Sequence, residues 1–207
     1  MSDQPQPLVL AVLVSGNGSN LQSIIDRIDA GTINARIACV VSNTPDAHAL
    51  LRARRHGIPA LTHDNSTYGN RKEYDAALVK ILAGYGVKLV VLAGFMRILS
   101  EVMVTAFPHA IMNIHPALLP AFPGLHAQRQ ALEYGVRYSG CTVHFVDCGT
   151  DTGPIIIQSV VPVMQDDTEE SLSRRIQKEE HQVFPEAVRL FAEGKISVNG
   201  RHVHLLA

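Results

Sequence analysis

The sequence Leu8-Val-Leu-Ala-Val-Leu-Val14 runs directly into Ser15-Gly-Asn-Gly-Ser-Asn20, and this junction decides the fold. An unbroken apolar run that ends at Ser15-Gly16 is typical of a strand buried on both faces of a parallel sheet. Beyond the glycines, apolar residues recur at the spacing of one helix face: Leu21, Ile24, Ile25 and Ile28. A strand, a glycine turn and a helix open an α/β unit, so we predict an α/β fold.

The same alternation continues toward the middle of the chain. The patterns predict strands over 37–41, 87–93 and 110–115, a short extended segment after 56–59, and helices over 45–55, 74–85 and 101–107. Such a series favours right-handed crossovers. We therefore expect a doubly wound, mostly parallel sheet with helices on both faces.

The pattern changes after Gly124. A helix over 127–134 precedes two strand-like runs, 141–146 and 155–163, with no helix-length segment between them. We expect these runs to pair antiparallel and to form a sheet edge after the fifth strand. A long helix over 168–193, kinked or divided by Pro185, and a hairpin over 196–203 turning at Asn199-Gly200 complete a single domain.

Composition narrows the class of protein. The 207 residues carry 18 Lys and Arg against 19 Asp and Glu, a net charge of -1 that argues against a nucleic-acid partner. The apolar run at 8–14 is too short to span a membrane. Residues 1–7 lack the basic start and apolar stretch of a secretory signal, so we expect a cytoplasmic protein. The Cys and His residues show no zinc-ligand spacing, and we expect no metal.

The loop Gly16-Asn-Gly-Ser-Asn20 is the first candidate site. Glycines allow close approach of the backbone, and a helix start presents unpaired N–H groups, which suits an anion such as phosphate. The loop lacks the Gly-Lys-Ser/Thr of a P-loop, and Leu21 occupies the position of a third dinucleotide-binding glycine. The loop therefore favours a phosphomonoester. The alternative is a tight turn with Ser19 or Asn20 as the helix cap.

The second and third candidates are polar groups near strand ends. Asn113 and His115 alternate along the fifth strand and point to the same side, where an amide and an imidazole could stabilise an oxyanion and move a proton. They could instead be a hydrogen-bonded pair that ends a strand. In the turn-rich loop 147–154, Asp151 could orient and charge a histidine, or the loop aspartates could satisfy only their own backbone.

Four motifs together resemble the phosphoribosylglycinamide formyltransferase family: Ser-Gly-Asn-Gly-Ser-Asn-Leu at 15–21, Leu-Ala-Gly-Phe-Met-Arg-Ile-Leu at 92–99, Asn-Ile-His-Pro-Ala-Leu-Leu-Pro at 113–120 and Asp-Thr-Gly-Pro-Ile at 151–155. They occur in the family's order and span nearly the whole chain. Asn-x-His followed by Leu-Leu-Pro resembles the wider group of formyltetrahydrofolate-using enzymes, whereas the glycine loop and Pro-Gly-Leu-His at 123–126 resemble the ribonucleotide branch more specifically.

The resemblance implies transfer of a formyl group from 10-formyltetrahydrofolate, the co-substrate, to the amine of glycinamide ribonucleotide in purine synthesis. It implies that residues 1–207 form one formyltransferase domain, with 8–115 mainly holding the ribonucleotide phosphate and 116–207 completing the folate site before the final helix and hairpin. The implied catalytic residues are Asn113, His115 and Asp151; the ribonucleotide ligands are Gly18, Ser19, Asn20 and Glu180; the folate ligands are Arg71, Met96, Arg97, Ile98, Leu99, Asn113, Asp147 and Asp151.

Some of these residue assignments have structural alternatives. Glu180 could be a helix-surface charge, and 96–99 could be ordinary packing after a strand. Ala117 departs from the serine common in the family. Three other functions are considered. A formyltetrahydrofolate hydrolase would be expected to have an additional amino-terminal domain, and a methionyl-tRNA formyltransferase a further carboxyl-terminal domain. The third is a non-catalytic module that binds a sugar phosphate. We expect small-molecule partners only, without nucleic acid or membrane, and a monomer or homodimer.

Overall fold

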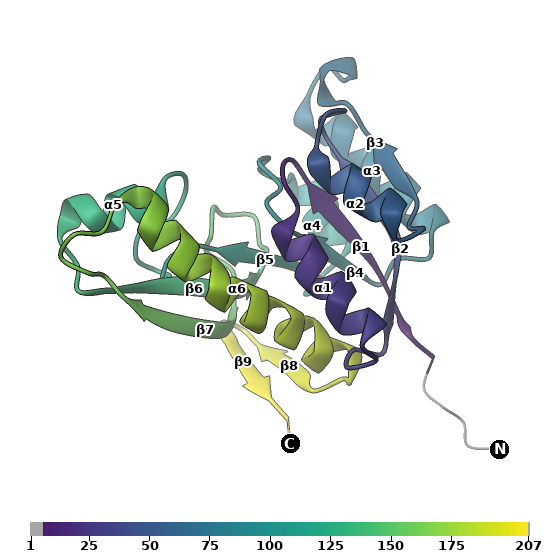
Figure 1. The fold of residues 1–207 in the computed structure, drawn as a ribbon. Coiled ribbons are helices and arrows are strands. Elements are labelled where there is room, and N and C mark those ends of the chain that lie inside the picture. Colours follow the sequence, from purple (N-terminus) through teal and green to yellow (C-terminus); the bar gives the residue numbers. More distant parts are fainter. Residues whose placement is uncertain (1–5, 207) are drawn as a thin grey trace.

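A computed structural model describes residues 6–206, and its central feature is a seven-stranded sheet (Figure 1). The strands are β1 (Leu8–Val14), β2 (Ala35–Ser42), β3 (Ala60–Thr62), β4 (Leu89–Leu92), β5 (Ile111–His115), β6 (Tyr138–Phe145) and β7 (Ile155–Pro162). Their order is β3-β2-β1-β4-β5-β6-β7. The first five strands pair parallel, whereas β6 and β7 pair antiparallel, which confirms the predicted fold class and edge.

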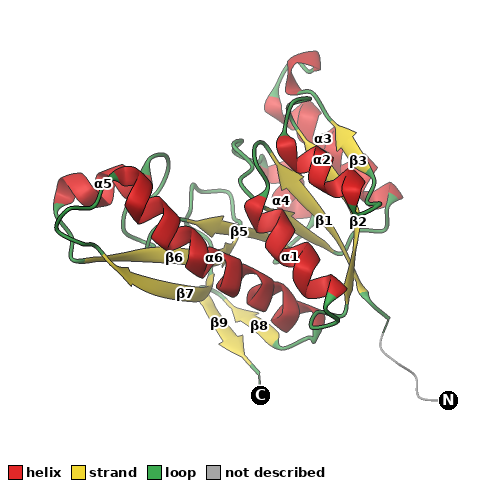
Figure 2. Ribbon diagram, viewed as in Figure 1, coloured by secondary structure: helices red, strands yellow, loops and turns green. Residues whose placement is uncertain are grey.

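Helices cover both faces of the sheet (Figure 2). They are α1 (Ser19–Asp29), α2 (His48–Arg55), α3 (Arg71–Gly84), α4 (Glu101–Ala106), α5 (Ala127–Tyr134) and α6 (Glu169–Ala192), with a 3₁₀ turn, η1 (Asn65–Thr67). A separate hairpin of β8 (Ile196–Asn199) and β9 (His202–Leu205) ends the described chain.

The side chains of β1 show how the two faces arise. Leu10 and Val12 belong to a core shared with α1, α2 and α6, while Ala11 and Leu13 belong to a second core shared with α3 and α4. All four side chains are fully buried. Because side chains alternate along a strand, a continuous apolar sequence is what a strand with helices on both sides requires.

Two local expectations differ from the structure. Of the kink or division expected at Pro185, the division is wrong, because the helix runs unbroken from Glu169 to Ala192 with Ile176, Phe184 and Val188 buried on both sides of the proline. Burial of this continuous apolar face stabilises the helix across the one hydrogen bond that proline removes. The hairpin turn consists of Gly200 and Arg201, because Asn199 still pairs with His202 in the ladder.

Asp167 directly precedes Thr168, the cap of α6, and its side chain is almost fully buried. Arg175 donates to both of its oxygens, at 2.7 and 2.9 Å, and the Met164 N–H and the Ser171 hydroxyl donate at 2.7 Å. The Arg175 hydrogen bonds, joined by those from Ser171 and Met164, hold the pKa of Asp167 well below its usual range.

Asp167→Asn should therefore lower the free energy of unfolding at pH 7 by about 1 to 2 kcal/mol, allowing for solvent screening around Arg175. A depressed carboxyl pKa stabilises the fold above the unfolded pKa of about 4, and this stabilisation is lost as pH falls below that value. Urea unfolding between pH 7 and pH 3 measures the effect. As the pH is lowered, the free energy of unfolding should fall less steeply in Asp167→Asn than in Asp166→Asn, which changes an exposed neighbour. Equal slopes would mean that the Asp167 carboxylate does not stabilise the fold.

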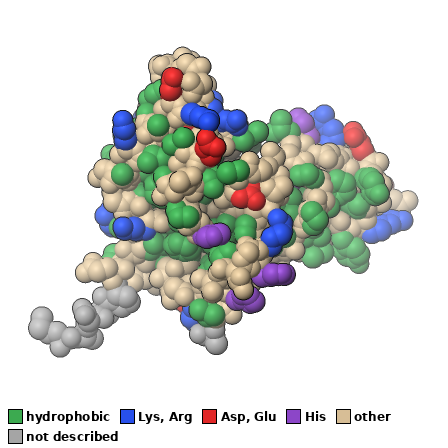
Figure 3. All heavy atoms as spheres, turned by 180° about the vertical axis from the view of Figure 1, so that it is seen from behind, with side chains coloured by type: hydrophobic (Ala, Val, Ile, Leu, Met, Phe, Trp, Pro, Cys, Tyr) green, Lys and Arg blue, Asp and Glu red, His purple; other side chains and the backbone are tan. Residues whose placement is uncertain are grey.

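Surface features add two observations. Within residues 6–206, none of the helices has the length and apolar character needed to cross a membrane. Figure 3 shows Lys and Arg side chains scattered over the rear face among hydrophobic and acidic ones, rather than gathered into one patch. The segment 1–5, which contributes to the expectation of no signal sequence, lies outside the described residues.

Candidate active site

A cavity of about 520 Å³ lies at the carboxyl ends of β4 and β5. Its walls come from the segment after β4, the end of β5, the start of α5 and the loop 146–151. It brings together the three predicted catalytic residues, Asn113, His115 and Asp151, from β5 and from a loop distant in sequence. The carboxyl ends of parallel strands are where ligands bind in open α/β sheets.

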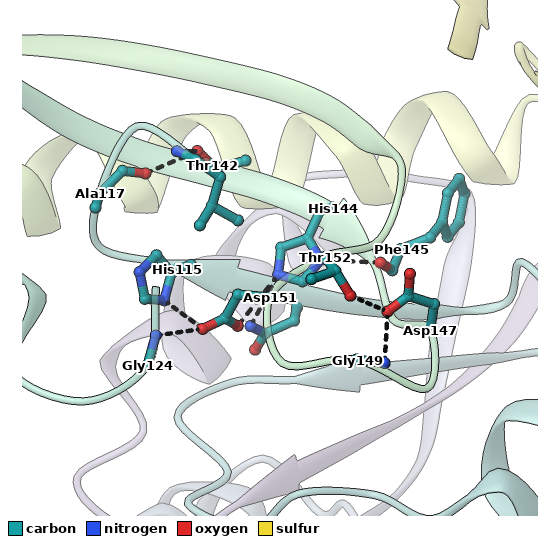
Figure 4. A network of polar contacts seen from close by, with 12 residues as sticks. His115, Ala117, Gly124, Thr142, His144, Phe145, Asp147, Gly149, Asp151 and Thr152 are labelled. Atoms are coloured by element: carbon teal, nitrogen blue, oxygen red, sulfur yellow. Dashed lines mark hydrogen bonds and ion pairs between the residues drawn. The ribbon is translucent and has the colours of Figure 1, made fainter. Parts of the chain in front are cut away.

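His115 lies between two hydrogen-bond acceptors. Its Nδ1 is 3.3 Å from Oδ2 of Asp151, and its Nε2 donates to the carbonyl of Phe122 at 2.8 Å (Figure 4 shows the contact with Asp151). A carbonyl and a carboxylate only accept, so an imidazolium with N–H on both nitrogens satisfies both contacts. The site is therefore built to accommodate a positive charge on His115.

His144 also belongs to this polar network, and the sequence reasoning missed it. Its Nε2 lies 3.2 Å from Nδ2 of Asn113 and 3.7 Å from Oδ1 of Asp151. Its Nδ1 donates to the Phe145 carbonyl at 2.9 Å, so in the neutral ring Nε2 accepts from the Asn113 amide. His144 lies directly across the antiparallel ladder from Asn113, and that register could not be deduced from the sequence.

Burial and charge shift the pKa values of the central pair. Burial lowers the pKa of His115 below its ordinary value, although the Phe122 carbonyl and the Asp151 carboxylate oppose this shift. Burial alone would raise the pKa of Asp151, but the close contact with the His144 ring, the hydrogen bond from the Gly124 N–H and the adjacent imidazoles together lower it. Asp151 is therefore a carboxylate at neutral pH, and its charge, together with the Phe122 carbonyl, favours a proton on His115.

Asp151 is positioned by its backbone as well as by its side chain. It has a left-handed φ of 54°, a conformation that Asp and Asn tolerate better than most residues. The Gly124 N–H donates to its Oδ2 at 2.8 Å. Nearby, Asp147 accepts from the Gly149 N–H at 3.0 Å and from the Thr152 hydroxyl at 2.6 Å, which holds the loop closed on itself.

The predicted folate residues divide into two groups. Met96, Arg97, Ile98, Leu99, Asn113, Asp147 and Asp151 all line the cavity. Arg71 is the first residue of α3 and is exposed, and it is not part of this lining among the described residues. The segment 96–99 is anchored to α3, because the Arg97 guanidinium lies 4.6 Å from the centre of the Tyr74 ring and the Ser100 N–H donates to Asp75 at 2.6 Å.

The turn after His115 is held by Thr142. The Thr142 hydroxyl donates to the Ala117 carbonyl at 2.7 Å and accepts from the Leu119 N–H at 3.0 Å (Figure 4 shows the bond to Ala117). These bonds use backbone groups of the turn, so they do not depend on a hydroxyl at position 117.

The ribonucleotide residues predicted around the glycine loop also come together. Asn20, near the start of α1, donates to Oε2 of Glu180 on α6 at 2.9 Å, and both residues are buried. Burial raises the pKa of Glu180, and the hydrogen bond from Asn20 opposes it. The Oδ1 of Asn20 is buried without a partner among the described residues. Glu180 is therefore not a surface charge, and the Asn20 oxygen is an acceptor that a ligand donor could satisfy.

Gln177 and Ser15 were also missed by the sequence reasoning. Gln177, one helical turn before Glu180, donates to the Ser19 hydroxyl at 3.0 Å. Ser15 joins the glycine loop to the cavity: its hydroxyl accepts from the Met96 N–H at 2.9 Å, and its own N–H donates to the Gly94 carbonyl at 3.1 Å. The helix spacing could have indicated Gln177, but no sequence signal pairs Ser15 with Met96.

Gly18 caps α1 in a left-handed conformation with φ of 76°. A Cβ at this position would lie 2.6 Å from the Ala49 Cβ. Gly18→Ala should therefore lower the free energy of unfolding by about 1 to 3 kcal/mol, through backbone strain and overpacking. Gly16→Ala is the matched control because a Cβ there meets nothing within 4 Å. Thermal unfolding of both variants measures the difference, and equal losses would show that α2 does not constrain the loop.

Fold and site together define an α/β enzyme with an amide, an imidazole and a carboxylate in one cavity, the groups that acyl transfer uses. A family model described as formyl transferase matches residues 8–188. The phosphoribosylglycinamide formyltransferase of Escherichia coli (strain K12) is 44% identical over 92% of this chain and 90% of its own length. The chain belongs to the formyl transferase family, and within it to the phosphoribosylglycinamide formyltransferases.

Other comparisons extend this result. The trifunctional purine biosynthetic protein adenosine-3 of Drosophila melanogaster is 50% identical over 89% of this chain, which spans only 14% of that protein. The structure of glycinamide ribonucleotide transformylase 1 from Symbiobacterium toebii has a TM-score of 0.98 and 54% identity, covering 100% of this chain and 98% of that one. A formyltetrahydrofolate deformylase from Pseudomonas syringae pv. tomato str. DC3000 has a TM-score of 0.91 at 26% identity, covering 98% of this chain and 67% of that one.

Proposed function

We propose that this chain transfers the formyl group of 10-formyltetrahydrofolate to the amine of glycinamide ribonucleotide, a step of purine synthesis. The observation that carries the proposal is the convergence of Asn113, His115 and Asp151 in one cavity beside the segment 96–99. The names of the Escherichia coli and Haemophilus influenzae relatives and of the Symbiobacterium toebii structure, each at least 40% identical over most of the chain, specify the same substrate.

The chemistry starts with attack of the uncharged amine on the formyl carbon, which forms a C–N bond and moves the carbonyl electrons onto oxygen. An amide nitrogen carries two hydrogens, and His144 accepts one from Asn113. The second hydrogen is directed to the oxyanion. Positive charge on His115, favoured by Asp151, stabilises the same oxygen.

Proton movement completes the transfer. The attacking nitrogen becomes positively charged and loses a proton to the Asp151 carboxylate, because His115 already carries a proton on both ring nitrogens. The oxyanion then re-forms the carbonyl as the bond between the formyl carbon and the folate nitrogen breaks, and that nitrogen takes up the proton held by Asp151. The products are formylglycinamide ribonucleotide and tetrahydrofolate, with no covalent enzyme intermediate.

The ribonucleotide is assigned to the region between the glycine loop and α6. The free N–H groups at the start of α1 attract the phosphate, with Gly18, Ser19 and Asn20 as its ligands. Glu180 and the unpartnered oxygen of Asn20 accept hydrogen bonds from the substrate. The contacts of Ser15 with Gly94 and Met96 place this region next to the cavity, which supports passage of the amine from one to the other.

The same proposal assigns residues 8–115 mainly to phosphate binding and 116–207 to completing the folate site. Arg71 stays a predicted ligand for the polar part of the folate. We assign the chain two small-molecule substrates and a cytoplasmic location. Within residues 6–206, no three His, Cys, Asp or Glu side chains are grouped so as to hold a metal ion.

One assay separates the transferase from its rivals. The protein is mixed with 10-formyltetrahydrofolate, and release of tetrahydrofolate is followed with and without glycinamide ribonucleotide. Release that requires the ribonucleotide is the expected result. Release without it would indicate the hydrolase, and ribonucleotide binding without release would indicate a sugar-phosphate-binding module.

A further inference from the structure

The phosphate loop carries no cationic side chain of its own. Residues 15–20 read Ser-Gly-Asn-Gly-Ser-Asn, whereas a phosphomonoester carries close to two negative charges at neutral pH. The partial positive charge of a helix start offsets only a fraction of that charge. A cation from elsewhere in the fold is therefore to be expected beside the loop.

Arg52, on α2, is held against this loop. Its Nε donates to the Asn17 carbonyl at 2.8 Å and its Nη2 donates to the Asn17 side-chain oxygen at 3.2 Å. Its Nη1 donates to Oε1 of Gln22, in the first turn of α1, at 3.4 Å. One planar guanidinium thus bridges the loop and the helix that follows it through donors on three nitrogens, a spread that the compact ammonium of a lysine lacks.

The rest of α2 fits the same role. The Ala49 N–H donates to the Gly16 carbonyl at 3.0 Å, and Ala49 occupies the space where a Gly18 Cβ would lie. Ala49 and Arg52 are three residues apart and so share one face of the helix. The path of the loop from Gly16 to Gly18 is therefore shaped by this face of α2.

Arg52 also faces a polar hollow of about 340 Å³ that reaches the first residue of α1, Ser19. The other ionisable groups around this hollow are Asp26, Arg27 and His181. Arg27 donates to Gln182 at 2.8 Å, and Gln22, which also lines the hollow, contacts the His56 ring at 3.2 Å. Arg52 is the cation among these groups that bonds the glycine loop itself.

We propose that Arg52 is a positioning residue for the ribonucleotide phosphate: it fixes the glycine loop in its binding conformation and supplies the positive charge that the loop sequence lacks. This inference rests on the proposed function. It predicts that Arg52 contributes to binding of the substrate phosphate and does not contribute to binding of the folate.

The test compares Arg52→Ala with Arg55→Ala, which removes an exposed arginine from the same helix. Arg52→Ala should raise the KM for glycinamide ribonucleotide about tenfold to a hundredfold, as expected for lost hydrogen bonds from a charged group. The kcat and the KM for 10-formyltetrahydrofolate should stay within about twofold. Arg52→Lys should be intermediate, and Arg55→Ala should match the parent protein.

A substrate analogue without phosphate, glycinamide ribonucleoside, separates positioning from general support of the fold. The parent protein should prefer the phosphorylated substrate, and Arg52→Ala should reduce that preference about tenfold or more. Equal losses with both substrates, or no difference between Arg52→Ala and Arg55→Ala, would overturn the inference. If Arg52→Ala does not fold, Arg52→Lys gives the same comparison.

Failure of the proposed function is distinguishable from failure of this inference. If the parent protein shows no formyl transfer, calorimetric titration with ribose 5-phosphate still measures phosphate binding at the glycine loop. Weaker binding in Arg52→Ala but not in Arg55→Ala would support the inference, and equal binding in both variants would contradict it.

Discussion

Replacing His115 with Ala should lower kcat by about a hundredfold to ten-thousandfold, the range expected when a general acid–base group that also stabilises charge is lost. His115 is only 4% exposed, and its two ring nitrogens face the Phe122 carbonyl and the Asp151 carboxylate. Alanine removes the group on which positive charge develops, while the glycine loop, where the ribonucleotide phosphate is assigned, keeps its own contacts.

Single-turnover formyl transfer at saturating substrate measures this effect, with calorimetry to show that glycinamide ribonucleotide still binds. His204→Ala, at an exposed position of the terminal hairpin, serves as the control. A turnover in His115→Ala close to that of the control would remove His115 from the mechanism.

Asp151→Asn should reduce kcat to a similar extent with little loss of stability. Asparagine keeps the shape of the side chain, tolerates the left-handed φ of 54° and can still accept from the Gly124 N–H. What it loses is the negative charge that favours a proton on His115. The variant thus isolates the electrostatic part of the mechanism from the structure of the loop.

The measurement combines the single-turnover rate with an NMR titration of the imidazoles. Loss of the carboxylate should lower the pKa of His115 further, because the Asp151 charge is one of the influences that raise it. Wild-type turnover in Asp151→Asn, or a pKa of His115 that rises, would mean that the carboxylate does not stabilise the imidazolium.

The architecture could be predicted from the sequence because local patterns define it. The buried run at 8–14, the helix period that follows it and the absence of a helix before 155–163 are sufficient for a parallel sheet with an antiparallel edge. The details that failed depend on packing. Pro185 is tolerated because the apolar face of α6 is buried on both sides of it, and pairing of Asn199 with His202 moves the hairpin turn by one residue.

The site was less predictable, because its members meet across long stretches of sequence. Asn113 and His115 share a strand, and alternation alone places them on one side. His144 joins them only through the register of β5 with β6, and Arg52 reaches Asn17 only because α2 packs on the glycine loop. A pattern within one segment carries no information about such contacts.

The most direct test of the central claim follows the formyl carbon itself. The protein is given 10-formyltetrahydrofolate labelled with a heavy isotope in the formyl group, together with glycinamide ribonucleotide, and the products are identified by mass spectrometry. The account predicts that the label appears in formylglycinamide ribonucleotide in step with release of tetrahydrofolate. Label recovered in free formate, with the ribonucleotide unchanged, would contradict it.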